Sequence, residues 1–229
     1  GREHAIVWKI AQSPKVDKIY CAPGNGGIAE LAECVDIAAT DIENMVKFAK
    51  DNAIDLVMVA PDDPLVLGMV DAMEKEGIRA FGPRANAAII EGSKAFSKEL
   101  MKKYNIPTAN YEVFTDSTSA IDYIKAQNTF PTVIKADGLA LGKGVIIAQN
   151  LEEAEQAVHE MIDDGKFGKS GSRVVIEEFL TGPEVSVLAF TDGKTVKPMV
   201  SAQDHKRAYD NDEGLNTGGM GTFSPSRLY

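Results

Sequence analysis

Residues 132–148, Thr-Val-Ile-Lys-Ala-Asp-Gly-Leu-Ala-Leu-Gly-Lys-Gly-Val-Ile-Ile-Ala, decide how this chain folds. Two runs rich in β-branched residues, 132–136 and 144–148, flank a glycine-rich loop, which predicts two strands of a hairpin. A phosphate-binding loop of the strand-to-helix type is excluded, because only three residues separate Gly138 from Gly142 and a strand follows. We expect a hairpin loop whose backbone N–H groups and Lys143 could close over phosphates as a lid. An ordinary hairpin turn is the alternative.

The first third of the chain alternates strand and helix patterns. Apolar spacing predicts helices at 3–12, 42–50 and 65–76, and strands at 18–22, 55–60 and 78–83. The strand at 55–60 is apolar throughout, as in a parallel sheet that is buried on both faces. This order predicts an open, largely parallel βαβ domain. Because a helix pattern opens the chain, we expect a first strand and part of a glycine-rich turn to precede Gly1.

The pattern changes after about residue 107. Helices are expected at 117–127 and 151–165, and further strands at 173–177, 184–191 and 195–202. Strands now neighbour strands, which favours a mixed or antiparallel sheet, and 214–221 has the composition of a turn cluster. We therefore expect an α/β protein with domains at 1–92 and 93–229, the second including a lid subdomain at about 111–177.

Composition excludes several classes of protein. The 229 residues are 44% hydrophobic and 25% charged, which is ordinary for a globular chain, and a compact fold of this mass would expose about 10,000 Å². The net charge of −10 disfavours binding to nucleic acid or an anionic membrane. No apolar run reaches the roughly 18 residues of a membrane span, and the start lacks a signal-peptide pattern. Cys21 and Cys34 have no metal-binding spacing, so reduced thiols in a cytoplasmic protein are expected.

Two lysines stand where an anion would stabilise them. Lys135 interrupts an apolar strand, and burying its ammonium is costly without an anion. Lys94 opens a helix pattern, where a cation opposes the helix dipole and gains from a bound anion. The alternatives are an outward-pointing strand lysine and a solvated helix lysine.

Two further segments carry unusual polar residues. A buried strand ends in 177–180, Glu-Glu-Phe-Leu, whose backbone could contact an adenine edge, with Glu184 beyond it suited to ribose hydroxyls. An edge strand with a solvated acidic end is the alternative. Residues 203–207, Gln-Asp-His-Lys-Arg, and the glycine-rich 216–221 suit a carboxylate or phosphate substrate, or else form a surface loop.

Together these motifs resemble the glycinamide ribonucleotide synthetases, which are ATP-grasp enzymes of purine synthesis. The resemblance runs along the whole chain. It is carried by Gly-Arg-Glu-His-Ala at 1–5, Ala-Pro-Gly-Asn at 22–25, Glu-Gly-Ser-Lys-Ala-Phe at 91–96, Val-Ile-Lys-Ala-Asp-Gly at 133–138, Gly-Lys-Gly-Val at 142–145, Val-Ile-Glu-Glu-Phe-Leu at 175–180, Gln-Asp-His-Lys-Arg at 203–207 and Asn-Thr-Gly-Gly-Met-Gly at 216–221.

The resemblance implies ligation of glycine to 5-phosphoribosylamine, with ATP consumed and glycyl phosphate as the intermediate. It assigns the ATP site to Lys94, Lys135, Gly142, Lys143, Gly144, Glu177, Phe179, Leu180 and Glu184. It identifies Asp204, Lys206 and Arg207 as the catalytic residues, which bind glycine and the neighbouring phosphate. It assigns substrate binding to Gly1, Arg2, Gly24, Asn25, Asp62, Asn216, Thr217, Gly218 and Gly219.

The chain also departs from the family pattern. Ala60-Pro61-Asp62 stands where the family usually has Gly-Pro-Glu. The family's metal ligands for Mg²⁺ or Mn²⁺ are expected beyond Tyr229, so none is assigned here and the chain resembles a fragment of an enzyme that is a monomer at full length. Another ATP-grasp ligase, or a non-catalytic nucleotide-binding module, remains an alternative.

Overall fold

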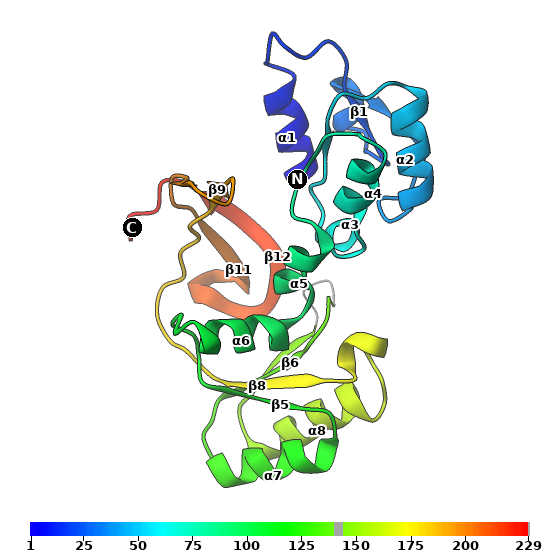
Figure 1. The fold of residues 1–229 in the computed structure, drawn as a ribbon. Helices are drawn as coiled ribbons and strands as arrows, with labels where there is room; N and C mark the ends of the chain where they lie inside the picture. Colours follow the sequence, from blue (N-terminus) through cyan, green and yellow to red (C-terminus); the bar gives the residue numbers. More distant parts are fainter. Residues whose placement is uncertain (140–143, 229) are drawn as a thin grey trace.

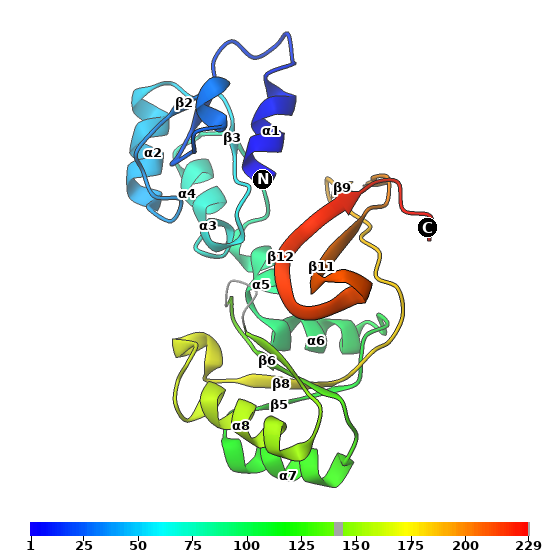
Figure 2. The same cartoon turned by 180° about the vertical axis from the view of Figure 1, so that it is seen from behind.

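The computed structural model describes residues 1–139 and 144–228 and confirms the α/β class (Figure 1). The N-terminal part lies at one end of the molecule, and a sheet covered by α7 (Ser117–Gln127) and α8 (Leu151–Ile162) lies at the other. Both views place the hairpin of β11 (Gln203–Tyr209) and β12 (Glu213–Phe223) beside the middle of the molecule, with α6 (Lys94–Lys103) between this hairpin and the sheet (Figure 2). Gly142 and Lys143 lie outside the described residues.

Residues 1–92 form the first α/β part, whose parallel pairing is as predicted. Its helices are α1 (Arg2–Ile10), α2 (Ile42–Asp51), α3 (Asp62–Val66), α4 (Met69–Lys75) and α5 (Ala85–Gly92), with a 3₁₀ turn η1 (Ile28–Glu30). Its strands are β1 (Tyr20–Cys21), β2 (Glu33–Cys34), β3 (Val57–Met58) and β4 (Ala80–Phe81). Within these fully described residues, β1 pairs with β2 and β3 with β4, as two separate parallel sheets. A small core of Met69, Val70 and Met73 packs against Ala49 and Val59.

The single helix expected at 65–76 is wrong. Gly68 adopts a left-handed conformation with φ of 90° and separates α3 from α4. Such a conformation ends a helix and favours glycine. The first helix also begins earlier than expected, at Asp62, because Pro64 lies in its first turn, where its missing N–H costs nothing.

The second part is an antiparallel sheet with strand order β5-β8-β6-β7 among the described residues. Its elements are α6 (Lys94–Lys103), β5 (Tyr111–Phe114), α7 (Ser117–Gln127), β6 (Thr132–Ala136), β7 (Val145–Ala148), α8 (Leu151–Ile162), η2 (Gly168–Gly171) and β8 (Val174–Glu178). The predicted hairpin is confirmed, with Ile134 opposite Ile146. Strand β5 was not expected from the sequence.

The two faces of this sheet differ in chemistry. Side chains at 134, 136, 174 and 176 form one core with α7 and α8. Because successive strand residues point to opposite faces, the side chains of Lys135 and Glu177 point to the other face, over which α6 lies. The sheet therefore presents Lys135 and Glu177, together with Val133 and Val175, to α6 and apolar groups to α7 and α8.

Two hairpins complete the described chain. They are β9 (Ala189–Thr191) with β10 (Val196–Pro198), and β11 (Gln203–Tyr209) with β12 (Glu213–Phe223), the latter joined by the 3₁₀ turn η3 (Asp210–Asp212). The turn cluster expected at 214–221 is wrong, because this segment pairs with β11. Gly214 and Gly219, with φ of 83° and 118°, make β12 irregular but do not end it.

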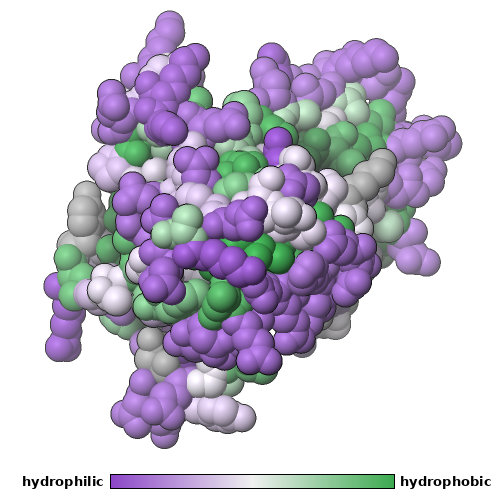
Figure 3. All heavy atoms as spheres, turned by 90° about the horizontal axis from the view of Figure 1, so that it is seen from below, coloured by the Kyte–Doolittle hydropathy of each residue, from purple (hydrophilic) through white to green (hydrophobic). Residues whose placement is uncertain are grey.

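The molecule is less compact than its mass suggests. It exposes 15043 Å², against about 10,000 Å² for a compact protein of this size. Hydrophilic residues dominate the face seen in Figure 3, with apolar residues showing between them. Large exposed apolar side chains gather in the last two hairpins, where Leu188 is 63% and Leu215 83% exposed. The N-terminal part contacts the β9–β10 hairpin through Phe81 and Phe190, whose ring centroids are 6.2 Å apart.

Candidate functional site

The N-terminus of α6 meets the ends of β6 and β8 at a buried carboxylate, Asp137. Its Oδ1 accepts hydrogen bonds from Ser93 Oγ (2.9 Å) and the Ala95 N–H (2.7 Å), and its Oδ2 accepts from Arg173 Nε (2.9 Å) and from Nη2. Ser93 in turn caps the helix by accepting from the Phe96 N–H. Asp137 therefore fixes the start of α6 relative to the sheet. Neither it nor Arg173 was singled out from the sequence.

Lys94, the first residue of α6, reaches across this junction. Its Nζ donates to the carbonyl of Gly138 at 3.0 Å, and its N–H donates to the carbonyl of Asp137. Burial lowers the pKa of Lys94 below its ordinary value of 10.5, and the nearby Asp137 opposes this effect. Lys135 lowers the pKa further by charge repulsion. Lys94 is thus a half-buried cation that an anion would stabilise, and its contact with a bound anion stays a prediction.

Glu177 joins two lysines on the same face of the sheet. Its Oε2 lies 3.0 Å from Lys135 Nζ and 3.1 Å from Lys98 Nζ. Glu177 and Lys98 are 6% and 8% exposed at their side chains, whereas Lys135 is 27% exposed. The Glu177 carboxylate is therefore already paired with two ammonium groups. Of the three side chains, Lys135 is the most exposed to solvent.

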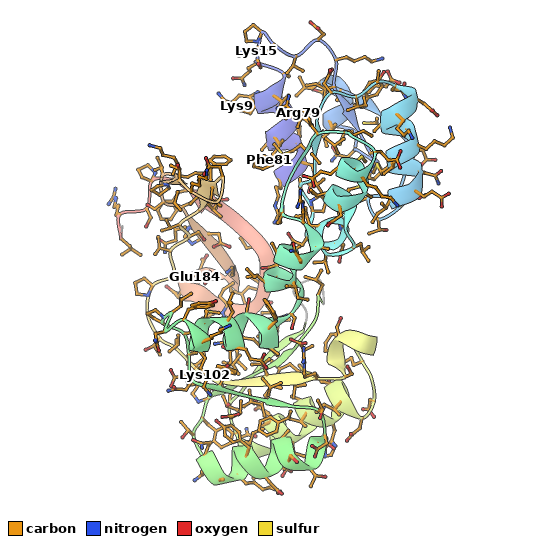
Figure 4. The ribbon with its side chains drawn as sticks, viewed as in Figure 1. Lys9, Lys15, Arg79, Phe81, Lys102 and Glu184 are labelled. Carbon is orange, nitrogen blue, oxygen red and sulfur yellow. The ribbon has the colours of Figure 1, made fainter. Side chains whose placement is uncertain are left out.

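A cavity of about 800 Å³ brings together six of the other predicted nucleotide and substrate residues. It lies between the segment after β8 and the β11–β12 hairpin. The predicted residues that line it are Phe179, Leu180, Glu184, Asp204, Lys206 and Arg207. Figure 4 labels Glu184 on the segment that runs beside the hairpin. An apolar wall and a charged wall thus face one space.

The charged side chains that line the cavity already have partners in the structure. Lys206 forms an ion pair with Glu184, and Lys206 Nζ lies 3.9 Å from Asp204 Oδ2. The hydrogen bond with Glu184 raises the pKa of Lys206 above its ordinary value, with burial opposing it. Arg207 Nη1 donates to the Gly214 carbonyl at 2.7 Å, which ties β11 to the start of β12. Lys206 is held as a cation by these carboxylates, and Arg207 lines the same cavity.

The glycine-rich strand opposite Arg207 has its own local contacts. Residue 216 is the register partner of Arg207 on β12. Thr217 Oγ1 accepts from the Gly219 N–H at 3.0 Å, and an added Cβ at Gly218 would meet no atom within 4 Å. The backbone here is open to close approach by a ligand. Gly144 immediately precedes β7, and its carbonyl accepts a hydrogen bond from the Ala136 N–H.

The predicted substrate residues of the N-terminal part converge separately. Arg2 Nη1 on α1 lies 3.4 Å from Asp62 Oδ1, and it donates to the Ala60 carbonyl at 3.2 Å. Gly1 immediately precedes α1 as its N-cap. The structure gives Asp62 an ion pair with Arg2 in this loop, which departs from the family pattern.

The loop at 23–27 folds tightly beside α1. Asn25 Oδ1 accepts from the N–H groups of Gly27 and Ile28, both at 3.1 Å. Gly24 has φ of 77°, and an added Cβ there would collide with Cys34 Sγ. His4 lies against Gly27, where an added Cβ would be 2.8 Å from its Cε1. Glycine at 24 is therefore required by the turn.

Within residues 1–139 and 144–228, no group of three or more His, Cys, Asp or Glu side chains could hold a metal ion. The residues of this part do not fit a metal site by themselves. No helix of the same described ranges is long and apolar enough to cross a membrane.

Comparison with models of known protein families finds matches to both parts of the chain. A family model described as "Phosphoribosylglycinamide synthetase, N domain" matches residues 1–91, and one described as "Phosphoribosylglycinamide synthetase, ATP-grasp (A) domain" matches residues 92–229. Curated relatives named phosphoribosylamine–glycine ligase are 56% identical over 98% of this chain in Halalkalibacterium halodurans and 55% over 99% in Haemophilus influenzae. These alignments cover 52% and 53% of the relatives, so the chain spans about half their length.

Solved structures agree with the fold. A crystal structure of phosphoribosylamine–glycine ligase from Thermotoga maritima is 34% identical with a TM-score of 0.82, covering 98% of this chain and 53% of that one. The biotin carboxylase domain of 2-oxoglutarate carboxylase from Hydrogenobacter thermophilus has a TM-score of 0.73 at 17% identity, covering 90% of this chain and 49% of that one. The second likeness shows a shared fold only.

Proposed function

Since the chain belongs to the phosphoribosylglycinamide synthetase family, we propose that it carries the nucleotide and substrate sites of an enzyme that ligates glycine to 5-phosphoribosylamine. The products are glycinamide ribonucleotide, ADP and phosphate. The observation that carries this proposal is the cavity on which Phe179, Leu180, Glu184, Asp204, Lys206 and Arg207 converge. The proposed domains are 1–92 and 93–229, and family matches that meet between residues 91 and 92 support this division. A lid subdomain at about 111–177 is part of the same proposal.

The residues divide by chemistry. Phe179 and Leu180 provide an apolar surface for adenine, and Glu184 is placed for the ribose hydroxyls. Lys94 at the start of α6 and Lys135 on the sheet face that α6 covers bind ATP phosphates. Gly142 and Lys143, which lie outside the described residues, and Gly144 are assigned to the same phosphates. ATP must exchange some existing ion pairs for its own, since Lys135 and Glu184 are already paired.

The acid and amine substrates occupy the remaining positions. Asp204, Lys206 and Arg207 bind glycine and the transferred phosphoryl group, beside 216–219. Gly1, Arg2, Gly24, Asn25 and Asp62 bind the phosphoribosylamine in the N-terminal part. A planar guanidinium and a lysine ammonium both complement carboxylate and phosphate oxygens.

The chemistry explains the need for this much positive charge. A carboxylate is a poor acyl donor, so a glycine oxygen first takes the γ-phosphoryl group of ATP, and ADP leaves. The amine nitrogen of the ribosylamine then attacks the glycyl carbonyl carbon. The C–O bond breaks, phosphate leaves with its electron pair, and the nitrogen loses a proton. Because several anions must come together, the protein contributes mainly positioning and charge neutralisation.

The proposal is tested by ADP release from the purified full-length protein. ADP should form only when ATP, glycine and phosphoribosylamine generated in place are all present. ADP release with another acid, such as bicarbonate, in place of glycine would identify a different ATP-grasp ligase. ATP binding without ADP release in any combination would identify a non-catalytic nucleotide-binding module.

Lys94 provides a test of the phosphate contact through protons. Its pKa is lowered in the protein, so in the window between that lowered pKa and 10.5 the site is partly neutral. A bound phosphate favours the ammonium, so ATP binding at a pH just below 10.5 should take up protons, and ATP affinity should fall as pH rises through this window. Calorimetry in two buffers of different ionisation enthalpy measures the uptake. Lys94→Met should abolish it, and equal uptake in this variant would contradict the contact.

Arg207 provides a test of the substrate side. Arg207→Lys keeps the positive charge but loses the planar pair of donors and the bond to the Gly214 carbonyl. We expect glycine-dependent kcat/KM to fall by about tenfold or more, equal to at least about 1.4 kcal/mol of transition-state stabilisation. ATP affinity should remain within about threefold of wild type, less than 0.7 kcal/mol. Wild-type kinetics for both glycine and phosphoribosylamine would remove Arg207 from the substrate site.

A further inference from the structure

Lys98 is a buried cation that none of the roles above uses. It lies on α6 with its side chain 8% exposed, and its Nζ has three oxygen partners. These are Glu177 Oε2 at 3.1 Å, Thr108 Oγ1 at 2.7 Å and the Ala109 carbonyl at 3.2 Å. An ammonium has three protons to donate, so this set satisfies it completely. Such a group is fixed in place, because leaving would strand a charge in a buried site.

The spacing of residues along helix α6 and the register of the sheet together bring Lys98 close to Glu177. Lys94 and Lys98 are four residues apart on α6 and therefore lie on the same face of the helix. Lys135 on β6 is the register partner of Val175 on β8, so Glu177 is its diagonal neighbour on the same face of the sheet. The helix thus supplies one ammonium and the sheet another, and both meet Glu177 Oε2.

The two lysines on Glu177 are not equivalent. Lys98 has three partners and is buried, whereas Lys135 is 27% exposed. Among the described residues, Glu177 is the polar partner that the structure gives Lys135. When an anion arrives on the open side, Lys135 is therefore the ammonium that can move to it. Its departure would leave Glu177 buried and unpaired if Lys98 were not there.

We propose that Lys98 is a positioning residue of the ATP site, whose buried ammonium balances the charge of Glu177 and so releases Lys135 to the phosphates. This inference rests on the proposed function, because it takes ATP as the anion. In the absence of Lys98, Glu177 has only Lys135 to pair with in this cluster and holds it back from the ligand. Lys98 therefore sets how readily Lys135 engages ATP without contacting ATP itself.

The experiment compares charge removal at Lys98 with and without the charge of Glu177 in the full-length protein. In Lys98→Met, the KM for ATP should rise by about tenfold, because an uncompensated buried carboxylate retains Lys135. The KM for glycine should stay within about twofold. In Lys98→Met combined with Glu177→Gln, Lys135 faces a neutral amide, so the KM for ATP should return to within about threefold of wild type.

Lys102→Met is the matched control. Lys102 lies one turn further along α6, is exposed and, like Lys98, has its ammonium near the Tyr111 ring (Figure 4). Its removal should leave the KM for ATP unchanged. Far-UV circular dichroism and thermal unfolding of every variant separate loss of ATP engagement from loss of the fold.

The ATP affinity of the double variant distinguishes a positioning role for Lys98 from a role in packing alone. If Lys98 only fills space and bonds Thr108, the double variant will bind ATP as weakly as Lys98→Met or more weakly, and the proposal is overturned. An unchanged KM for ATP in folded Lys98→Met overturns it as well. Should Lys98→Met not fold, the double variant against Glu177→Gln alone is the test, since equal ATP affinity is expected there and a further loss refutes the role.

The same variants separate this inference from the proposed function. Equilibrium titration with ATP measures the Lys98 effect even if no glycine-dependent ADP is formed. Failure of ADP release in wild type with the rescue intact would overturn the reaction but not the role of Lys98. Glycine-dependent ADP release in wild type, without recovery of ATP affinity in the double variant, would support the reaction and overturn the role of Lys98.

Discussion

Replacing Asp137 by alanine should lower the free energy of unfolding by about 3 kcal/mol, the low end of the cost of breaking a buried ion pair. Asp137 is 8% exposed and accepts hydrogen bonds from Ser93, the Ala95 N–H and two nitrogens of Arg173. Its loss leaves these donors without their acceptor at the junction of α6 with the sheet. The low end applies because the Arg173 side chain is 41% exposed and can recover water.

Urea unfolding of the purified protein, followed by circular dichroism, measures this change. Asp122→Ala is the matched control, because Asp122 is an exposed carboxylate on α7, and its loss should change stability by less than about 0.5 kcal/mol. Asp137→Asn should fall between the two, since it keeps an acceptor but places an NH₂ group against Arg173 or Ser93. A loss below about 1 kcal/mol in Asp137→Ala would mean that water replaces the carboxylate at little cost.

The parts of the fold with local signals could be predicted from sequence. Helix α7 and strand β6 have the expected bounds, because capping by Asp116 fixes the start of α7 and the β-branched run 132–134 indicates β6 locally. Strand β12 could not be predicted, since its glycines favour turns and only pairing with β11 extends them. The break at Gly68 was also hidden, because one glycine inside a helical pattern does not reveal its φ.

The candidate site divides in the same way. Lys135 could be found because a charged residue in an apolar strand is costly without a partner. Lys98 could not, since α6 has four lysines in ten residues and the sequence does not distinguish the buried one. The assignment of Glu177 to the ATP site stays a prediction, but the sequence did not indicate its pairing with Lys98 and Lys135, which the strand register brings about. Register between strands is a long-range property, which explains this difference.

Lys135→Ala should weaken ATP binding by about 1.5–3 kcal/mol, the range of a hydrogen bond to a charged group, or roughly 10- to 150-fold in Kd. The variant should fold, because Glu177 keeps Lys98 at 3.1 Å and the Lys135 side chain is already 27% exposed. Its stability should therefore change by less than about 1 kcal/mol. Titration calorimetry with ATP and urea unfolding measure the two quantities on the same preparation. Lys197→Ala, at an exposed lysine on β10, should alter neither.

The charge of Glu177 distinguishes a lysine that binds ATP from one that acts through the carboxylate. Glu177→Gln should not restore ATP affinity to Lys135→Ala, because the ammonium that meets the phosphates is gone. The same substitution should restore it to Lys98→Met, because there the ammonium is present and only retained by the carboxylate. Unchanged ATP affinity in folded Lys135→Ala would show that Lys135 remains on Glu177 when ATP binds, and the phosphate contact would then fall to Lys94 and the loop at 142–144.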